Sequence, residues 1–373
     1  MTAMERFTAG FLEEPGYLDY ARVGPLSAGV VSETLGQSDV LSRARYGSLG
    51  HFPGQDERLR TAVAQATGFR ADQVVSEPNT TTGIMQAMFG LTGGVLLSPG
   101  DFPAVPFAAA RAAEALRVVT PIWLQTDHGR VTPGEIREQL TPATAAVAVC
   151  LVDSRTGYRV DLDGIRQVIG DRLLIVDAIQ GFGVTDVPYE VADVVASGGQ
   201  KWARAGWGTG FLALSDRAIE RLIPVFSGFA GTDTAEPWDE ILPPSRGANA
   251  FRVSNPDPIA QARFATALEE VAEVGIRAIE AAIAVNVSCL IDLADEFAVP
   301  VVSSRDERER AGIVVLEPSA TQFTLLSAAL HNHGVTATTR NGTVRLSVHA
   351  ALSVDTVDML RGALTSYATA VTY

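Results

Sequence analysis

Short, continuous apolar runs alternate with stretches of helical periodicity through the first two thirds of the chain, and this rhythm constrains the fold more than any other feature. The apolar runs cover residues 93–99, 117–124, 145–153, 172–179 and 191–197. They do not alternate in polarity, which is typical of strands covered on both faces. Helices are predicted between them, at 81–92, 103–116, 133–140 and 161–169. The pattern predicts an α/β fold: a mostly parallel sheet with helices on both faces and right-handed crossovers.

The last third of the chain differs from the rest in composition and in its predicted elements. Residues 229–258 are rich in Pro, Gly and Asp and read as a long loop, and a long helical segment follows at 257–297 with Gly275 as a bend. The remainder mixes strands with a helix at 354–368. We therefore expect a large domain over 21–250, a small C-terminal α/β domain over 251–373 that begins with the long helix, and a segment 1–20 packed on the small domain.

Charge and cysteine usage exclude several classes of protein. The formal net charge of −14 argues against nucleic-acid and membrane-surface partners. The N-terminus lacks the basic-then-apolar order of a signal peptide, and no apolar run reaches transmembrane length. Cys150 and Cys289 stand in apolar surroundings and read as buried small hydrophobes, not as a disulfide or a metal pair. A cytoplasmic enzyme without a metal site is the expectation.

Three polar features fall at the ends of predicted strands. Asp177 ends one strand, and Lys201 follows the next strand inside "SGGQKW". The "NTTTG" sequence places Thr80 at the start of a helix, where hydroxyls, free N–H groups and the helix dipole can hold an anion. In a parallel sheet these ends meet at one edge. An amine, a carboxylate and an anion cradle together suggest pyridoxal phosphate, which needs a Schiff-base lysine, an acid for its ring nitrogen and a phosphate anchor.

The order and spacing of several motifs resemble one enzyme family. "GYLDYARVGPLS", "TTTGIMQAM", "DAIQ", "GGQKW" followed by "GWGTGFL", and "TVRLSVH" are similar to the corresponding segments of class V aminotransferases and cysteine desulfurases. These are pyridoxal phosphate enzymes of fold type I, and the resemblance spans nearly the whole chain. It implies a large cofactor-binding domain, a small C-terminal domain, and a homodimer with its sites at the interface.

The resemblance also implies a role for individual residues. Lys201 would form the Schiff base and Asp177 would pair with the pyridine nitrogen, and these two are the expected catalytic residues. The remaining expected cofactor contacts are Gln180 to the ring oxygen, Thr80 and Thr81 to the phosphate, Phe102 stacked on the ring, and Ser154, Gln200 and, from the neighbouring subunit, Asn255. Arg345 would bind the substrate carboxylate, with Arg155 as a second substrate contact.

Simpler structural roles compete with some of these assignments. The threonines could be helix caps, Phe102 a core residue, and Arg345 an outward strand residue or half of an ion pair. Trp202 reads as a packing residue. The histidines of "HNH" at 331–333 indicate a solvated helix end and not a metal site.

The reaction type is left open by the sequence. Residues 331–342 correspond to the loop that carries the reactive cysteine of cysteine desulfurases, and they contain no cysteine. Transamination of an amino acid is the first expectation, because it needs only Lys201 as a proton shuttle. Alternatives are a C–S lyase similar to cysteine-conjugate or selenocysteine lyases, an epimerase, and a non-catalytic binding protein of the same fold. A phosphosugar- or nucleotide-binding protein would explain the threonines but not the lysine, and no Gly-rich dinucleotide or Walker-type loop occurs.

Overall fold

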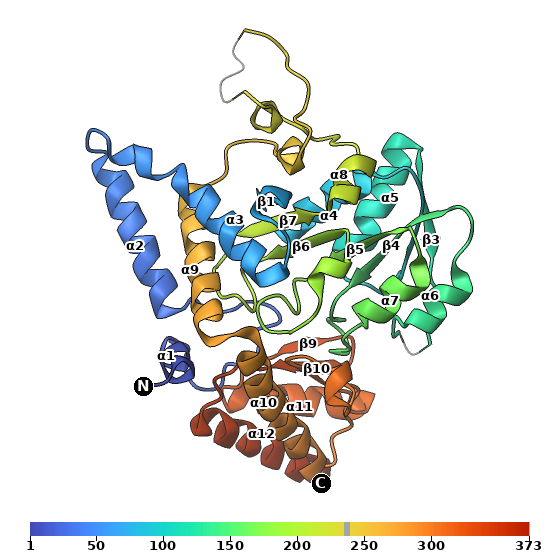
Figure 1. Cartoon of the computed structure of the whole chain (residues 1–373). Coiled ribbons are helices and arrows are strands. Elements are labelled where there is room, and N and C mark those ends of the chain that lie inside the picture. Colours follow the sequence, from blue (N-terminus) through green and yellow to red (C-terminus); the bar gives the residue numbers. More distant parts are fainter. Residues whose placement is uncertain (128, 235–238, 373) are drawn as a thin grey trace.

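The computed structural model describes residues 1–127, 129–234 and 239–372. A large α/β body, a smaller body that contains the C-terminus, and the N-terminal helix beside their junction are visible in Figure 1. A loop was predicted over 229–258, and its described parts are irregular chain with two short 3₁₀ helices. Positions 235–238 lie outside the described residues.

A seven-stranded sheet forms the centre of the large body. Its strands are β1 (Val74–Glu77), β2 (Gly93–Leu97), β3 (Val119–Trp123), β4 (Thr144–Cys150), β5 (Leu173–Asp177), β6 (Val194–Gly198) and β7 (Gly210–Leu214). The spatial order is β1-β7-β6-β5-β4-β2-β3. The strand β7 pairs antiparallel with β1 and with β6, and the other four pairs are parallel, so the predicted mostly parallel sheet is confirmed. The five predicted strands are β2–β6, whereas β1 and β7 were not predicted.

Side chains of β4 alternate between two separate hydrophobic cores. Ala146 and Ala148 belong to the core under α4 (Thr80–Gly90), α5 (Ala104–Leu116) and α8 (Asp216–Arg221). Val147 and Val149 belong to the other core, which is completed by helices on the opposite face: α3 (Gly54–Thr67), α6 (Pro133–Gln139), α7 (Leu162–Ile169) and α9 (Pro258–Val274). The central strands β4, β5 and β6 are therefore buried on both faces, which explains why their runs in the sequence are continuous.

The small body contains a three-stranded antiparallel sheet of order β8-β10-β9. Its elements are α10 (Ile276–Glu296), β8 (Ile313–Leu316), α11 (Ala320–Asn332), β9 (Thr338–Arg340), β10 (Thr343–Ser347) and α12 (Val354–Thr372). The predicted bent helix 257–297 is in fact two helices, α9 and α10, which meet at 83°. Gly275 separates them with φ +88°, a left-handed conformation that favours glycine. Among the described residues no single helix could cross a membrane, although α9 and α10 taken together meet the length and composition test.

The N-terminal segment connects the two bodies. It contains α1 (Ala3–Ala9) and precedes α2 (Ala28–Arg43). Bridges pair Tyr17 with Thr336 and Asp19 with Ser347, so residues 17–19 lie along the small sheet. The buried Arg204 donates to the carbonyl oxygens of Gly10 and Pro25, which fixes the segment against the large body.

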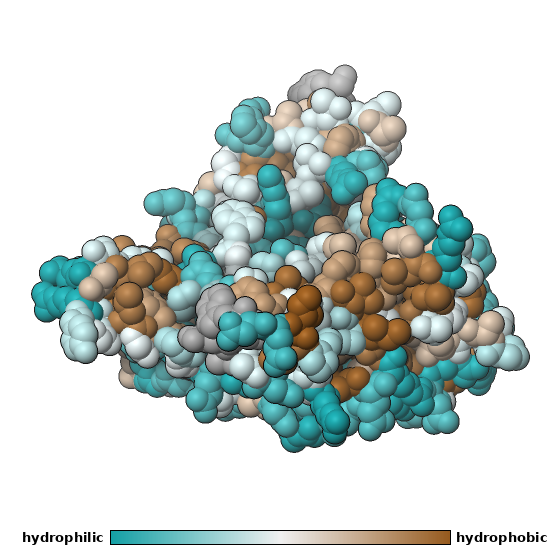
Figure 2. Space-filling model, turned by 90° about the horizontal axis from the view of Figure 1, so that it is seen from above, coloured by the Kyte–Doolittle hydropathy of each residue, from teal (hydrophilic) through white to brown (hydrophobic). Residues whose placement is uncertain are grey.

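Several large apolar side chains remain exposed in the single chain. Figure 2 shows hydrophobic residues gathered in patches on the upper face of the molecule. Tyr46, Trp207, Phe229 and Ile241 are among the exposed apolar side chains, and Ile241 is fully exposed. Large contiguous apolar patches are uncommon on the surfaces of monomeric soluble proteins.

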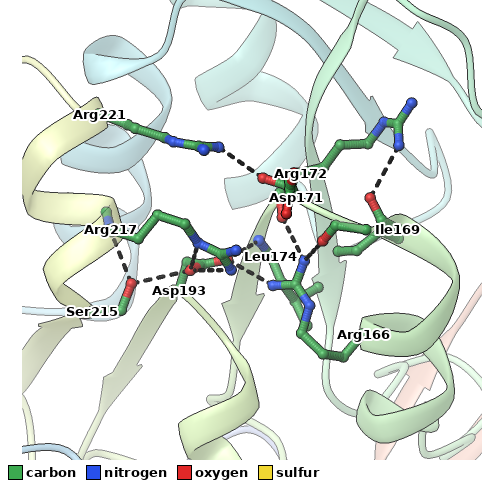
Figure 3. A network of polar contacts seen from close by, with 11 residues as sticks. Arg166, Ile169, Asp171, Arg172, Leu174, Asp193, Ser215, Arg217 and Arg221 are labelled. Carbon is green, nitrogen blue, oxygen red and sulfur yellow. Dashed lines mark hydrogen bonds and ion pairs between the residues drawn. The ribbon is translucent and has the colours of Figure 1, made fainter.

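An arginine network secures the amino ends of the central strands (Figure 3). Asp193, directly before β6, accepts hydrogen bonds from Arg166 and Arg217 and from the N–H of Leu174 in β5. Arg172 donates to the carbonyl of Thr144 at the start of β4. These bonds satisfy polar groups at one edge of the sheet and leave the carboxyl edge free for chemistry.

Candidate active site

A cavity of about 620 Å³ lies at the carboxyl ends of the parallel strands. The chain segments that follow β2, β4, β5 and β6 form one side of it, and the β9–β10 hairpin of the small body forms the other. Six of the predicted site residues line it: Phe102, Ser154, Arg155, Gln180, Lys201 and Arg345. The cavity therefore lies at the edge of the sheet where the site was expected.

Lys201 is the only lysine in the chain, and close backbone packing explains its glycine-rich turn. Gly24 donates its N–H to the carbonyl of Gln200, and a Cβ on Gly24 would lie 1.8 Å from the carbonyl oxygen of Lys201. A Cβ on Gly199 would meet the side chains of Thr209 and Ala205 within 2.8 Å. Only glycine permits these approaches, so the turn holds the lysine backbone rigidly at the end of β6.

Burial makes Lys201 and Asp177 an unusual pair. Loss of hydration lowers the pKa of Lys201 to about 8, although the Asp177 carboxylate opposes the shift. Burial raises the pKa of Asp177 to about 6, opposed by the Ile179 N–H and by Lys201. Near neutral pH the carboxylate is thus mostly ionised, while an appreciable fraction of the amine is neutral. Such values suit an amine that must act as nucleophile and base.

Thr80 stands at the start of α4, where the cap is a different residue. The side chain of Asn79 accepts from the N–H of Thr82, so capping does not use the Thr80 hydroxyl. That hydroxyl is buried without a partner. Thr81, in contrast, is exposed. Thr80 is therefore not the N-cap of α4, and its hydroxyl is available to bind an anion.

Unpartnered buried atoms provide a test of whether pyridoxal phosphate fits. Within the part of the chain that the structure describes, buried side-chain atoms without a hydrogen-bond partner include Thr80 Oγ1, Asp177 Oδ2, Gln200 Oε1 and Arg345 Nε. All four belong to predicted site residues, although Thr80, Asp177 and Gln200 do not line the cavity itself. The cofactor requires an acceptor for its ring N–H and a donor for its phosphate, which Asp177 and Thr80 would supply. An amino acid requires a donor for its carboxylate, which Arg345 would supply. The residues therefore fit pyridoxal phosphate.

Gln180 and Phe102 have surroundings that the sequence did not specify. The amide of Gln180 donates to the Ala21 carbonyl and accepts from the Trp202 indole, so Trp202 both packs in the core and orients Gln180. Its remaining amide hydrogen is the part available for a cofactor contact. Phe102 is not a core residue, because it is 41% exposed and its ring centroid lies 5.2 Å from the Lys201 Nζ.

Arg345 lies at the cavity and also takes part in an ion pair. It lines the cavity from β10 and lies 3.6 Å from a carboxylate oxygen of Asp19. It also donates to the Ser154 carbonyl and to the Thr338 hydroxyl. The guanidinium is therefore held in place with Nε still free. Arg155 is half exposed and is paired with Asp153 at 2.9 Å.

Some predictions place residues away from this cavity. Asn255 is exposed and does not line it. Cys150 is buried as expected, but Cys289 is only partly buried because α10 presents it toward a surface hollow. His331 is exposed at the end of α11, and His333 contacts Ser366. No group of three metal-ligating side chains occurs within the described residues.

Three charged lining residues were missed by sequence reasoning. Asp101 directly precedes Phe102, and burial, with the nearby Asp153 and Asp177 carboxylates, raises its pKa to about 7. Its position after a predicted strand was a usable signal. Arg22 and Arg340 lie 318 residues apart in the numbering and reach the same cavity only through tertiary packing.

A mostly parallel seven-stranded sheet with a small C-terminal body over its carboxyl edge is the architecture of fold-type-I pyridoxal phosphate enzymes. Within that class the chain belongs to the class V aminotransferase family, because the family model described as Aminotransferase class-V matches residues 47–371. The cofactor is accordingly pyridoxal 5'-phosphate. The fold and family predicted from the motifs are confirmed.

Solved structures of similar fold include cysteine desulfurases and a C–S lyase. The apo cysteine desulfurase from Thermococcus onnurineus NA1 has 19% identity and a TM-score of 0.82, covering 93% of each chain. The cystine C–S lyase C-DES, in complex with its reaction product cysteine persulfide, has 18% identity and a TM-score of 0.85 over 95% of this chain and 98% of that one. The cysteine desulfurase CsdA from Escherichia coli has 16% identity and a TM-score of 0.81 over 98% of each. No curated protein matches the sequence.

Proposed function

We propose that the protein is a pyridoxal phosphate-dependent aminotransferase that removes a proton from the Cα of an amino acid. The observation that carries this proposal is Lys201, the only lysine of the chain, buried at the carboxyl edge with a pKa of about 8 and an adjacent carboxylate. Transamination needs one group that takes the proton from one carbon and returns it to another. Lys201 is suited to both steps because it is close to balance between its two protonation states.

Each remaining role follows from the environment of a side chain. Bound pyridoxal phosphate supplies an electron sink for the negative charge that develops at Cα. Asp177 Oδ2 would hold a proton at the pyridine nitrogen, and Thr80 Oγ1 would bind the phosphate. Arg345 Nε would bind the α-carboxylate, which turns the Cα–H bond toward Lys201. The Phe102 ring would cover one face of the cofactor.

A C–S lyase is the second candidate, and a specific observation favours it over cysteine desulfuration. Within residues 331–342, the segment that contributes Arg340 and Asn341 to the cavity, no cysteine is available to accept sulfur. C-DES, whose fold is similar, is a cystine C–S lyase with cysteine persulfide as its product. A lyase of that kind releases the sulfur on the product and needs no protein thiol at this position.

Product analysis separates the two candidates. The purified holoenzyme is incubated with a panel of amino acids and cystine, with and without a keto-acid acceptor. Transamination predicts keto-acid formation only when the acceptor is present, whereas the lyase predicts pyruvate and ammonia from a sulfur amino acid without it. Both candidates require that the cofactor is attached to Lys201, which borohydride reduction and peptide mapping test. We expect one pyridoxyl group on Lys201 in the wild type and none in the lysine-free Lys201→Arg variant. A protein with no adduct on Lys201 would instead be a non-catalytic member of the fold.

We also propose that the enzyme is a homodimer. The exposed apolar residues Tyr46, Phe229 and Ile241, and the patches visible in Figure 2, support a surface that is covered by a second copy. Asn255 is exposed, as a residue that contacts the neighbouring subunit's cofactor would be in a single chain. Sedimentation of the holoenzyme tests the dimer, and an Asn255→Ala variant with unchanged cofactor affinity would contradict the shared site.

A further inference from the structure

The charge of the cavity lining is opposite to that of the whole protein. Five lining side chains are cationic: Arg22, Arg155, Lys201, Arg340 and Arg345. Asp101 is the one acidic residue that lines the cavity among the described residues. In a chain of formal net charge −14, this concentration of positive charge points to an anionic ligand.

Three of the five cations have a carboxylate of their own. Arg155 pairs with Asp153 at 2.9 Å, Arg345 lies 3.6 Å from Asp19, and Lys201 is next to Asp177. These internal partners leave little charge for recognition of a second group beyond the α-carboxylate and the cofactor.

Arg22 and Arg340 lack an equivalent partner. Arg22 is 3.9 Å from Asp19, which is closer to Arg345, and its side chain is 74% exposed. Arg340 has no carboxylate within 4.0 Å across 1–127, 129–234 and 239–372. Two cations therefore border one cavity with their charge largely uncompensated.

The position of Arg340 is set by a tight hairpin. It pairs with Thr343 across the two-residue turn of Asn341 and Gly342, whose φ angles are +51° and +82°. A turn with two left-handed residues matches the twist of the flanking strands and holds them in register. Arg345 lies on the second strand of the same hairpin, so both arginines belong to one rigid element that also contacts the N-terminal segment through Asp19.

We propose that the substrate is an amino acid whose side chain ends in an anionic group, with the α-carboxylate bound by Arg345 and the distal anion by Arg22 and Arg340. The inference rests on the proposed function, since it assumes an amino acid in this cavity. A carboxylate and a phosphate ester share the required chemistry, because guanidinium groups bind both through charge-assisted hydrogen bonds.

Matched pairs of amino acids test the charge requirement. The holoenzyme is titrated with L-glutamate against L-glutamine, L-aspartate against L-asparagine, and O-phospho-L-serine against L-serine, following the cofactor spectrum and, where turnover occurs, kcat/KM. The anionic member of at least one pair is expected to be preferred by roughly 10–100-fold, the size of charge-assisted hydrogen bonds. The preference should decrease at high ionic strength. The three pairs distinguish the two side-chain carboxylates from a phosphate.

Variants connect the preference to the two arginines. Arg22→Gln combined with Arg340→Gln is expected to reduce the anionic-to-neutral ratio to nearly one. Arg137→Gln is the matched control, since Arg137 is an exposed arginine on α6 without an ion pair among the described residues, and its ratio should equal that of the wild type.

The outcomes separate this inference from the proposed function. If amino acids change the cofactor spectrum but neutral members are bound equally well, or the double variant keeps the full preference, the inference is wrong and the proposed function stands. If no amino acid changes the spectrum of protein that carries the cofactor on Lys201, both are wrong. A preference lost in the double variant and retained in the control supports the assignment.

Discussion

The pKa of Lys201 is the quantity on which the proposed chemistry most depends. Burial lowers it to about 8 from an ordinary 10.5, a difference worth about 3 kcal/mol between the two protonation states. At pH 7 an amine of pKa about 8 is about one-tenth neutral, whereas an ordinary lysine is neutral in roughly one molecule in 3,000. The buried environment therefore supplies roughly 300-fold more of the reactive form.

The sequence makes this pKa directly measurable. Since Lys201 is the only lysine, competitive acylation of the apo-protein over pH 6–10 gives a single modified lysine peptide by mass spectrometry, with the α-amino group as internal reference. We expect the rate to rise with pH and level off through a midpoint near 8. A rate that rises tenfold per pH unit up to pH 10 would refute the argument that burial tunes this lysine.

A variant of Asp177 tests the sign of the coupling. The Asp177 carboxylate favours the ammonium form and so raises the pKa of Lys201 against the effect of burial. Asp177→Asn keeps the shape and can still accept from the Ile179 N–H, but it removes the charge. The acylation midpoint should therefore move to lower pH. A midpoint that moves upward would mean that the two groups do not interact as the structure places them.

Three further predictions concern the scaffold. Asp193→Ala leaves two arginines of the network in Figure 3 without their buried carboxylate, and should cost about 3 kcal/mol or more of unfolding free energy in urea titrations. Gly24→Ala places a Cβ 1.8 Å from the carbonyl oxygen of Lys201, so the turn must move and cofactor incorporation should fall at least about tenfold in a protein that still folds. Burial raises the pKa of Glu77 to about 8, so wild-type stability is lost as pH rises from about 4.5 to 8, and Glu77→Gln should increase thermal stability more at pH 8 than at pH 5.

Matched controls accompany these variants. Asp39→Ala removes an exposed ion pair on α2 and should change the unfolding free energy by less than about 1 kcal/mol. Gly36→Ala adds a Cβ in open space, so cofactor incorporation should be unaffected. Glu138→Gln removes an exposed carboxylate, and its effect on thermal stability should be the same at pH 5 and at pH 8. If a variant and its control change the measured quantity equally, the structural reason given for that variant is wrong.

Local sequence was sufficient for the elements that are long or covered on both faces. The runs that became β2, β4, β5 and β6 were recognisable because strands between two hydrophobic cores are apolar at nearly every position. The strands β1 and β9 were missed because runs of three or four residues carry too little signal. The strand β7 was missed as well, although it is as long as β2. Gly275 was identified as a bend, but the 83° angle depends on how α9 and α10 pack.

The sequence by itself determined the α/β class, the family, and the placement of Asp177 and Lys201 at the carboxyl edge of a sheet, because a parallel sheet aligns the ends of its strands. Tertiary structure alone decided which atoms of those residues are free, how far burial shifts their pKa values, and that Arg22 and Arg340 border the same cavity. Hydrogen-bond satisfaction, desolvation and long-range proximity are properties of the folded arrangement, and no local pattern in the chain encodes them.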